Sequence, residues 1–243
     1  ALQQDNYTIL AEDALPALLA ALDSSRLQAE HFPLLDTLSE WGYRFDAQKQ
    51  APILFYEWYY TFKRLVWDEY YDQQEEKPIP MPQDWVTIAL LKEQPQLRFF
   101  DHGGTPERET ARDIATNAFL EIADTLSKKL ESAADWGHYL QRQIPHLARI
   151  PAFSYRGLIT GGFDDALNSI KPSNGPSWRM VVELGPEVTA YGVYPGGQSG
   201  NPGSPYYQNM VDSWANGEYY ELKLMKDEED LPGRVLLNLR LEN

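Results

Sequence analysis

The sequence predicts an α+β fold, because helical and strand patterns occupy different parts of the chain. Up to about residue 140, apolar side chains recur at steps of three and four, which is typical of amphipathic helices. Beyond Pro145, glycine and proline become frequent and the apolar pattern changes to alternation. We therefore expect a mainly helical region over 1–145 and a glycine-rich, strand-rich region over 146–243, together forming one structural unit.

Three helices are predicted in the first 71 residues. Apolar residues from Asn6 to Leu22 recur at helical spacing, and we expect Pro16 to divide this run into two pieces. A second, short helix is expected from His31 to Trp41, and a third from Pro52 to about Tyr71. The third helix carries a largely aromatic stripe that requires burial. Its members are Phe55, Trp58, Tyr59, Phe62, Leu65 and Val66.

The longest helix is expected from residue 106 to about 132. Before it, the segment 73–83 contains three prolines and reads as a connector, followed by a short apolar run from Trp85 to Leu91. Thr105 is suited to cap the long helix, and Pro106 to occupy its first position. An apolar stripe then continues for over five turns. It consists of Ala111, Ile114, Ala115, Ala118, Phe119, Ile122, Ala123, Leu126 and Leu130.

Four strands are predicted near the C-terminus. Trp178 to Leu184 and Val188 to Tyr194 alternate and are joined by a turn containing Gly185-Pro186, which indicates a hairpin. Tyr219 to Leu224 and Arg234 to Leu241 supply two more strands, joined by the acidic loop KDEEDLPG.

Composition excludes several function classes. Among 243 residues, 21 lysines and arginines face 36 acidic residues, and the net charge of -15 repels nucleic acid and anionic lipid headgroups. No apolar run approaches the roughly 20 residues that cross a bilayer, so no membrane interaction is expected. The absence of cysteine excludes disulfides and thiolate metal sites and leaves the redox compartment open.

Metal and acid–base sites are not marked by the sequence. The four histidines lack the spacing of three or four at which two would share a metal on one helix face, so structural or solvent-exposed roles are favoured. The acids Asp164-Asp165 and Asp227-Glu228-Glu229-Asp230 lack the alternation and central glycine of a calcium loop. A glycosidase-type carboxylate pair stays open, because nothing marks one pair above another. We predict no metal and no cofactor. The histidines are His31, His102, His138 and His146.

The stretch PGGQSGNPGSPYY over 195–207 resembles a catalytic loop only superficially. Ser199 lacks the Gly-x-Ser-x-Gly spacing of a nucleophile elbow, and no histidine follows it in the chain. A phosphate loop would need a lysine that is absent here. We therefore interpret Ser199 and Ser204 as turn hydroxyls bonded to nearby backbone, and no catalytic residue is assigned. Positive φ angles and close backbone approach are expected at Gly196, Gly197, Gly200 and Gly203.

An ordered series of local patterns over nearly the whole chain resembles the C-terminal part of the β chain of the penicillin acylase (penicillin amidase) family. The series comprises AEDALPALL from Ala11, Leu38-Ser-Glu-Trp41, Phe45-Asp46, APILFYEWYYTFKRL from Ala51, Trp136-Gly137, His146-Leu147, Ile150-Pro151, Gly161-Gly162-Phe163-Asp164 with Asn168, Gly175-Pro176-Ser177-Trp178-Arg179, Gly196-Gly197-Gln198-Ser199-Gly200-Asn201-Pro202, Ser204, Tyr207, Trp214 and Tyr219-Tyr220.

The resemblance implies part of an N-terminal-nucleophile hydrolase with an αββα sandwich. In such enzymes a self-cleaved precursor exposes a nucleophile whose own α-amine acts as base, and backbone N–H and an asparagine hold the oxyanion. Ala1 has neither hydroxyl nor thiol, so we expect this chain to be inactive alone and to need the α chain and the N-terminal part of the β chain as partners.

The resemblance further implies hydrolysis of linear amides, with a role in antibiotic biosynthesis or degradation, and a periplasmic or secreted protein. Substrate-binding residues stay unassigned. Self-association of the isolated chain is expected if its sheet edges are bare. The alternative is a non-catalytic module that binds a carbohydrate or peptide through exposed aromatic side chains.

Overall fold

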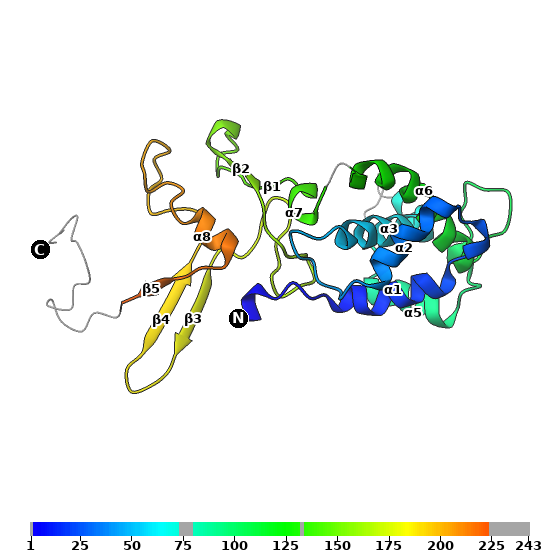
Figure 1. Ribbon diagram of the computed structural model, residues 1–243, viewed down its shortest axis with the longest axis horizontal. Helices are drawn as coiled ribbons and strands as arrows, with labels where there is room; N and C mark the ends of the chain where they lie inside the picture. Colours follow the sequence, from blue (N-terminus) through cyan, green and yellow to red (C-terminus); the bar gives the residue numbers. More distant parts are fainter. Residues whose placement is uncertain (1, 73–79, 132–133, 224–243) are drawn as a thin grey trace, which may run out of the picture. The chain divides into compact units, whose positions relative to one another are not determined.

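The computed structural model describes residues 2–72, 80–131 and 134–223, and the chain divides into two compact units between Gly175 and Pro176 (Figure 1). Helices and antiparallel strands both occur, which confirms the predicted α+β class. In the described parts of the chain, no helix is long and apolar enough to cross a membrane.

The first unit is mainly helical. Short helices and turns surround two long helices, α3 and α6, and a two-stranded sheet follows them (Figure 1). Its elements are η1 (Leu2–Gln4), α1 (Ile9–Ala21), η2 (Ser24–Arg26), η3 (Ala29–His31), α2 (Phe32–Ser39), α3 (Ala51–Val66), α4 (Asp68–Asp72), α5 (Asp84–Glu93), η4 (Arg98–Phe100), α6 (Ala111–Glu131), α7 (Trp136–Tyr139), β1 (Arg142–Ile144), η5 (Pro151–Phe153) and β2 (Tyr155–Leu158).

The core of the first unit forms where α3 packs against α6. The predicted aromatic stripe of α3 is buried except at Leu65, which is partly buried. The alanines of α6 allow close approach, and the Trp58 indole donates to the carbonyl of Ala115 at 2.9 Å. Trp58 also lies edge-to-face against Phe119 at 5.0 Å between ring centroids. Burial of the aromatic face therefore accounts for the helix that the spacing predicted.

The predicted division of the first helix at Pro16 is wrong, because α1 is continuous from Ile9 to Ala21. Pro16 has no N–H to donate to the carbonyl of Glu12, four residues earlier. Both residues are exposed, so that carbonyl is open to solvent, while the opposite face stays buried and holds the helix together.

The third predicted helix is two helices, since α3 ends at Val66 and α4 begins at Asp68. Trp67 between them leaves the helical region, with φ -115° and ψ 34°. Its buried indole donates to the hydroxyl of Thr87 on α5 at 2.9 Å. This tertiary hydrogen bond explains a break that periodicity alone does not show.

The predicted start of the longest helix is also wrong, because α6 begins at Ala111 and not at 106. The Thr110 backbone and hydroxyl both donate to the carboxylate of Asp113, at 3.0 and 2.7 Å. Ala111 is buried and donates its N–H to the carbonyl of Pro95. The hydroxyl of Thr105 instead bonds within an exposed turn, to the carbonyl of His102. The helix therefore begins after Thr110, next to the core, and not at the predicted Thr105-Pro106.

The sheet of β1 and β2 was not predicted. The strands pair antiparallel, with Gln143 opposite Arg156 and Ile144 opposite Tyr155, and the register shifts between Arg142 and Gln143. Only three and four residues long, they carry no apolar alternation that sequence reasoning detects.

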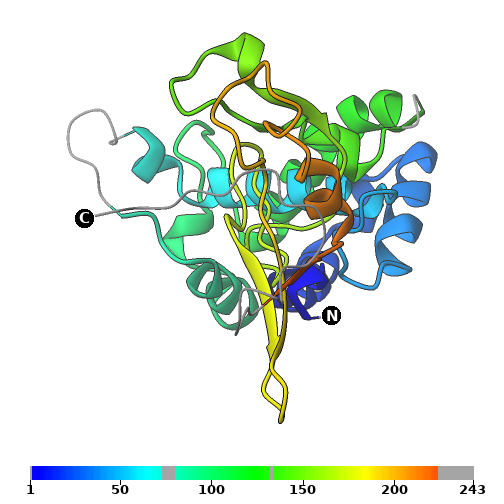
Figure 2. The same cartoon turned by 90° about the vertical axis from the view of Figure 1, so that its left-hand side faces the viewer.

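The second unit contains a three-stranded antiparallel sheet in the order β3 (Arg179–Glu183), β4 (Thr189–Val193), β5 (Tyr220–Leu222), with helix α8 (Val211–Asn216). Figure 2 shows β3 and β4 as a long two-stranded ribbon, and its tip lies away from α8. The predicted hairpin is confirmed, with Val181 opposite Tyr191. The strand predicted over Arg234 to Leu241, its acidic loop and the connector residues 73–79 lie outside the described residues.

Candidate functional site

Motif residues from separate parts of the first unit meet around Gly162. The Trp136 indole donates to the carbonyl of Gly162 at 2.9 Å, and the Gly162 N–H donates to the carbonyl of Phe45 at 2.9 Å. The guanidinium of Arg142 donates to the same Gly162 carbonyl at 2.8 Å. We call this group, together with Asn6, Asp46 and Asn168, the loop junction.

Two asparagines connect the loop junction to the start of the chain. The Asn168 amide donates to the side-chain oxygen of Asn6 at 2.8 Å, and the Asn6 amide donates to Asp46 at 2.8 Å. Asn168 is 3% exposed, so its polar atoms depend on partners within the protein. The backbone of Asn168 also donates to the carbonyl of Asp5 at 2.9 Å. A network of this kind fixes one loop conformation.

Glycine is required at two positions of the loop junction. Gly162 has φ +100°, and a Cβ there would lie 2.3 Å from the carbonyl oxygen of Asn168. At Gly161 a Cβ would lie 2.5 Å from the Asn6 amide and 2.9 Å from the carbonyl of Phe45. The Gly161-Gly162 pair of the motif is therefore a backbone requirement.

Arg142 is the buried cation of the loop junction. Its side chain is fully buried, and its guanidinium donates to the carbonyls of Thr160 and Gly162 and lies 5.4 Å from the ring of Trp136. Burial lowers the pKa of Arg142 to about 10, so the group is charged at neutral pH. Carbonyl dipoles and the indole face compensate part of the charge that water would otherwise solvate.

The second unit repeats the combination of arginine, tryptophan and carbonyl. Arg179 on β3 donates to the carbonyl of Trp214 at 2.7 Å, and its guanidinium lies 4.8 Å from the ring centre. The Trp214 indole donates to the carbonyl of Pro176 at 2.9 Å. Burial lowers the pKa of Arg179. These motif residues anchor α8 and the start of the hairpin to each other.

The loop over 195–207 uses its hydroxyls as predicted. Ser199 Oγ accepts the N–H of Asn201 at 3.1 Å, and Ser204 Oγ accepts the N–H of Tyr206 at 3.2 Å. Close backbone approach is confirmed at Gly197, where a Cβ would lie 2.0 Å from the carbonyl of Tyr206. The predicted positive φ angles are wrong, because the glycines with positive φ in the described ranges are Gly157, Gly162 and Gly217. Glycine is therefore required at position 197 because the backbone of Tyr206 lies close to it, and not because φ is positive.

The four histidines lie in separate places. His31 is buried edge-to-face against Phe119, and its Nδ1 accepts from the N–H of Gln28. Nδ1 of His102 accepts from the N–H of Gly104, and Nδ1 of His146 from that of Ala148. His138 is described below. Within the three described ranges, no group of three or more His, Cys, Asp or Glu could hold a metal.

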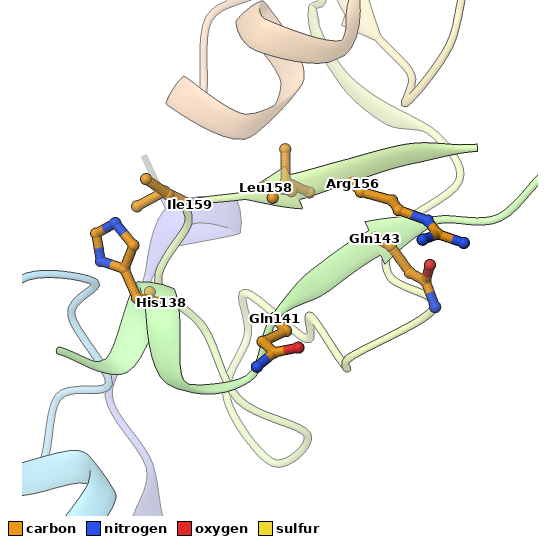
Figure 3. Close-up of a pocket in the computed structure, with 8 residues that line it drawn as sticks. His138, Gln141, Gln143, Arg156, Leu158 and Ile159 are labelled. Atoms are coloured by element: carbon orange, nitrogen blue, oxygen red, sulfur yellow. The ribbon is translucent and has the colours of Figure 1, made fainter. Parts of the chain in front are cut away.

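His138 lines a pocket of about 530 Å³ beside α7 and the small sheet, shown in Figure 3. Gln141, Gln143 and Arg156 add amide and guanidinium donors to its wall, and Ile159 lies beside His138 (Figure 3). The pocket suits a polar or anionic group. Sequence reasoning missed it, because its residues come from three short elements.

Asp135 positions His138. Its carboxylate accepts the backbone N–H of His138 at 3.0 Å, which caps α7, and lies 2.5 Å from Nδ1 of the ring. Burial works to raise the pKa of Asp135, but the hydrogen bonds from the side chain and backbone of His138 outweigh it and lower the pKa. The spacing Asp-x-x-His, with a good N-cap residue before Trp136, is the sequence signal for this turn.

The acids Asp164 and Asp165 behave as the sequence predicted for solvated charge. Both are exposed, and Asp164 pairs with Lys171 at 2.5 Å. Partial desolvation, with the charges of Asp84 and Asp164, raises the pKa of Asp165.

Comparison with known proteins places this architecture in context. The sequence model of a family described as penicillin amidase matches residues 1–230. An acyl-homoserine lactone acylase QuiP of Pseudomonas fluorescens (strain Pf0-1) is 30% identical over 156 residues, covering 58% of this chain and 18% of that protein. The protein of the same name in Pseudomonas syringae pv. syringae (strain B728a) is 37% identical over 147 residues, covering 53% of this chain and 18% of that protein. The chain thus matches less than a fifth of the length of either relative.

Proposed function

The chain belongs to the penicillin amidase family, and we propose that it is the C-terminal part of an acylase that hydrolyses linear amide (C–N) bonds. The proposed substrates join an acyl group to an amine, as in acyl-homoserine lactones or the side chains of lactam antibiotics. In this proposal the 243 residues supply helices and sheet strands to an αββα sandwich of the N-terminal-nucleophile type, and they are inactive alone.

The observation that carries this proposal is the exposed apolar hairpin. Consecutive residues Met180, Val181 and Val182 are 46%, 42% and 40% exposed, so apolar side chains on both faces of β3 are partly exposed to solvent. An antiparallel sheet normally packs one face on a core. In the described part of the sheet, β3 is also an edge strand, with a row of backbone groups open to pairing. Leu184 near the tip is 86% exposed.

We propose that the α chain and the N-terminal part of the β chain cover this hairpin and provide the nucleophile. The Ser199 and Ser204 hydroxyls already bond the backbone of their own turns, so neither is proposed as nucleophile. The loop junction then serves to hold the helical unit in one conformation. Periplasmic or secreted location is part of the same proposal.

A hydrolysis assay tests whether the chain is inactive alone and becomes active with the preceding segments of the precursor. The purified 243-residue chain should show no turnover of a chromogenic acyl anilide, and co-expression with the preceding segments of an acylase precursor should produce it. Turnover by the chain alone that is abolished by Ser199→Ala would overturn the proposal.

The hairpin is tested separately by a matched pair of substitutions. Val181→Glu places a charge on the bare strand and should prevent recovery of activity on co-expression, because a buried unpaired carboxylate costs several kcal/mol. Leu147→Glu is the control, since Leu147 is 99% exposed and lies in the first unit. Full activity with Val181→Glu would contradict the assigned role of the hairpin.

The alternative function is binding of a carbohydrate or peptide through exposed aromatics, and Trp85, which is 71% exposed, favours it. This alternative expects ligand-dependent quenching of tryptophan fluorescence in the chain alone. Quenching that Trp85→Ala removes would support it, and unchanged emission over a ligand panel would count against it.

A further inference from the structure

Three aromatic rings form a corner beside α3. Tyr56 and Tyr60 lie one turn apart on the helix, with ring centroids 4.8 Å apart and planes inclined by 47°. Phe163, in the loop after β2, is inclined to both by 84° and 64°, at centroid distances of 6.1 and 6.5 Å. Phe163 stacks one face on Phe45 at 4.2 Å, so a ligand in this corner meets its other side together with the rings of Tyr56 and Tyr60. Rings inclined to one another present π faces in more than one direction, as in sites that surround a cation.

A pocket of about 250 Å³ opens at this corner. Leu140, Ile170 and Pro172 complete an aliphatic wall, and Asp164 and Lys171 also line the pocket. Pockets for drug-sized ligands measure roughly 300–1,000 Å³, so this one suits a single small group. Asp164 and Lys171 are paired with each other and half-exposed, so water screens the pair, and neither charge closes the pocket.

The charges around the corner favour a cation. Lys63 pairs with Asp84 at 2.6 Å and Lys171 pairs with Asp164 at 2.5 Å, so the excess negative charge of this group is that of Asp165, which lies next to Asp164 in the chain. Burial, and then the charges of Asp84 and Asp165, raises the pKa of Tyr60. The net charge of -15 over the chain adds a long-range field that attracts cations.

We propose that the pocket of Tyr56, Tyr60 and Phe163 binds an alkylated ammonium group of the trimethylammonium type. The rings supply π faces, the aliphatic wall contacts the methyl groups, and the carboxylates complement the charge. An inorganic cation would be poorly accommodated, since among the described residues that line the pocket Asp164 is the one carboxylate, and hard metal ions require several oxygen ligands. The inference does not depend on amide hydrolysis, so it stands or fails independently of the proposed function.

Calorimetric titration of the 243-residue chain with choline tests the proposal. The control ligand is 3,3-dimethylbutan-1-ol, which has the shape of choline without its charge. We expect choline to bind at least about tenfold more tightly, as desolvated cation–π contacts predict. Equal binding of the two ligands would show an apolar pocket, and no binding of choline would show no site; either result overturns the proposal.

Substitutions locate the binding within the pocket. Tyr60→Phe keeps the ring and should change choline affinity by less than about threefold, whereas Tyr60→Leu should weaken it about tenfold. Tyr206→Leu, at an exposed tyrosine of the second unit, is the control and should leave the affinity unchanged. If Tyr60→Leu impairs folding, Asp164→Asn at the half-exposed carboxylate should weaken choline binding and leave the neutral ligand unaffected. Choline affinity unchanged by both Tyr60→Leu and Asp164→Asn would overturn the assignment.

Discussion

Gly162→Ala should destabilise the first unit more than any other glycine substitution of equal backbone strain. Gly162 combines φ +100° with a Cβ position 2.3 Å from the carbonyl oxygen of Asn168. That oxygen accepts the N–H groups of Phe163 and Ile170, at 3.2 and 2.9 Å, so moving it would stretch two hydrogen bonds. The overlap between the new methyl group and the Asn168 carbonyl therefore cannot be relieved without weakening other contacts.

The expected loss of unfolding free energy in Gly162→Ala has two parts. A left-handed backbone costs an L-residue about 1–2 kcal/mol, and forcing a methyl group into a packed site costs about 1–3 kcal/mol. Gly162→Ala should thus lower the free energy of unfolding by about 2–5 kcal/mol. Gly157→Ala is the matched control, because Gly157 has φ +71° and nothing within 4 Å of its Cβ position. It should show only the backbone part, about 1–2 kcal/mol.

Urea unfolding followed by far-ultraviolet circular dichroism measures both variants against the unsubstituted chain. Tryptophan emission provides a second probe, because the Trp136 indole bonds the Gly162 carbonyl. The reasoning is refuted if Gly162→Ala costs no more than Gly157→Ala, since the difference between them isolates the overlap with Asn168.

Further predictions concern other contacts. Trp58→Phe should lower the free energy of unfolding by about 1–3 kcal/mol, measured by urea unfolding, because the buried carbonyl of Ala115 loses its indole partner. The hydrogen bond from Arg112, with that from Ser25, lowers the pKa of Asp23 to about 2. Since the folded pKa is below 3.8, the usual pKa of an aspartate, this stabilisation is present above pH 3.8 and is lost as the pH falls through about 2. Arg112→Ala should raise the Asp23 pKa in an NMR titration. Ser199→Ala removes one exposed turn hydrogen bond, so it should cost less than about 1 kcal/mol in urea unfolding.

Sequence reasoning succeeded where burial follows a local period. The stripe on α3 and the β3–β4 hairpin were predictable, since each pattern repeats over enough residues to define a face. Helix boundaries were less predictable, because a tertiary contact decides them. Thr105-Pro106 is as good a start signal as Thr110. The two are distinguished by the burial of Ala111 and by the hydrogen bond from its N–H to the carbonyl of Pro95.

The candidate sites were predictable only as separate motifs. The sequence offered Gly161-Gly162 and Trp136 as parts of a family pattern, without indicating that they meet. Their meeting depends on Arg142, a buried charge that a periodic pattern of apolar residues does not predict. It also depends on the pair Asn6 and Asn168, which no spacing rule connects. Of the four loop glycines predicted to need positive φ or close approach, Gly197 is the one whose Cβ position overlaps its neighbours, and that overlap with the Tyr206 carbonyl exists only in the folded loop.

The hydrogen bond between Asn6 and Asn168 has a consequence for synthesis of the protein. The two residues are 162 positions apart in the chain. At about 5–20 residues per second, a ribosome needs roughly 8–30 s to add the intervening residues. During that interval the side-chain oxygen of Asn6 lacks its Asn168 donor, and the helices of the first unit can pack before the loop that locks them exists. A chaperone that shields the emerging chain would therefore act on the helical segments before the loop junction can close, which requires Asn168.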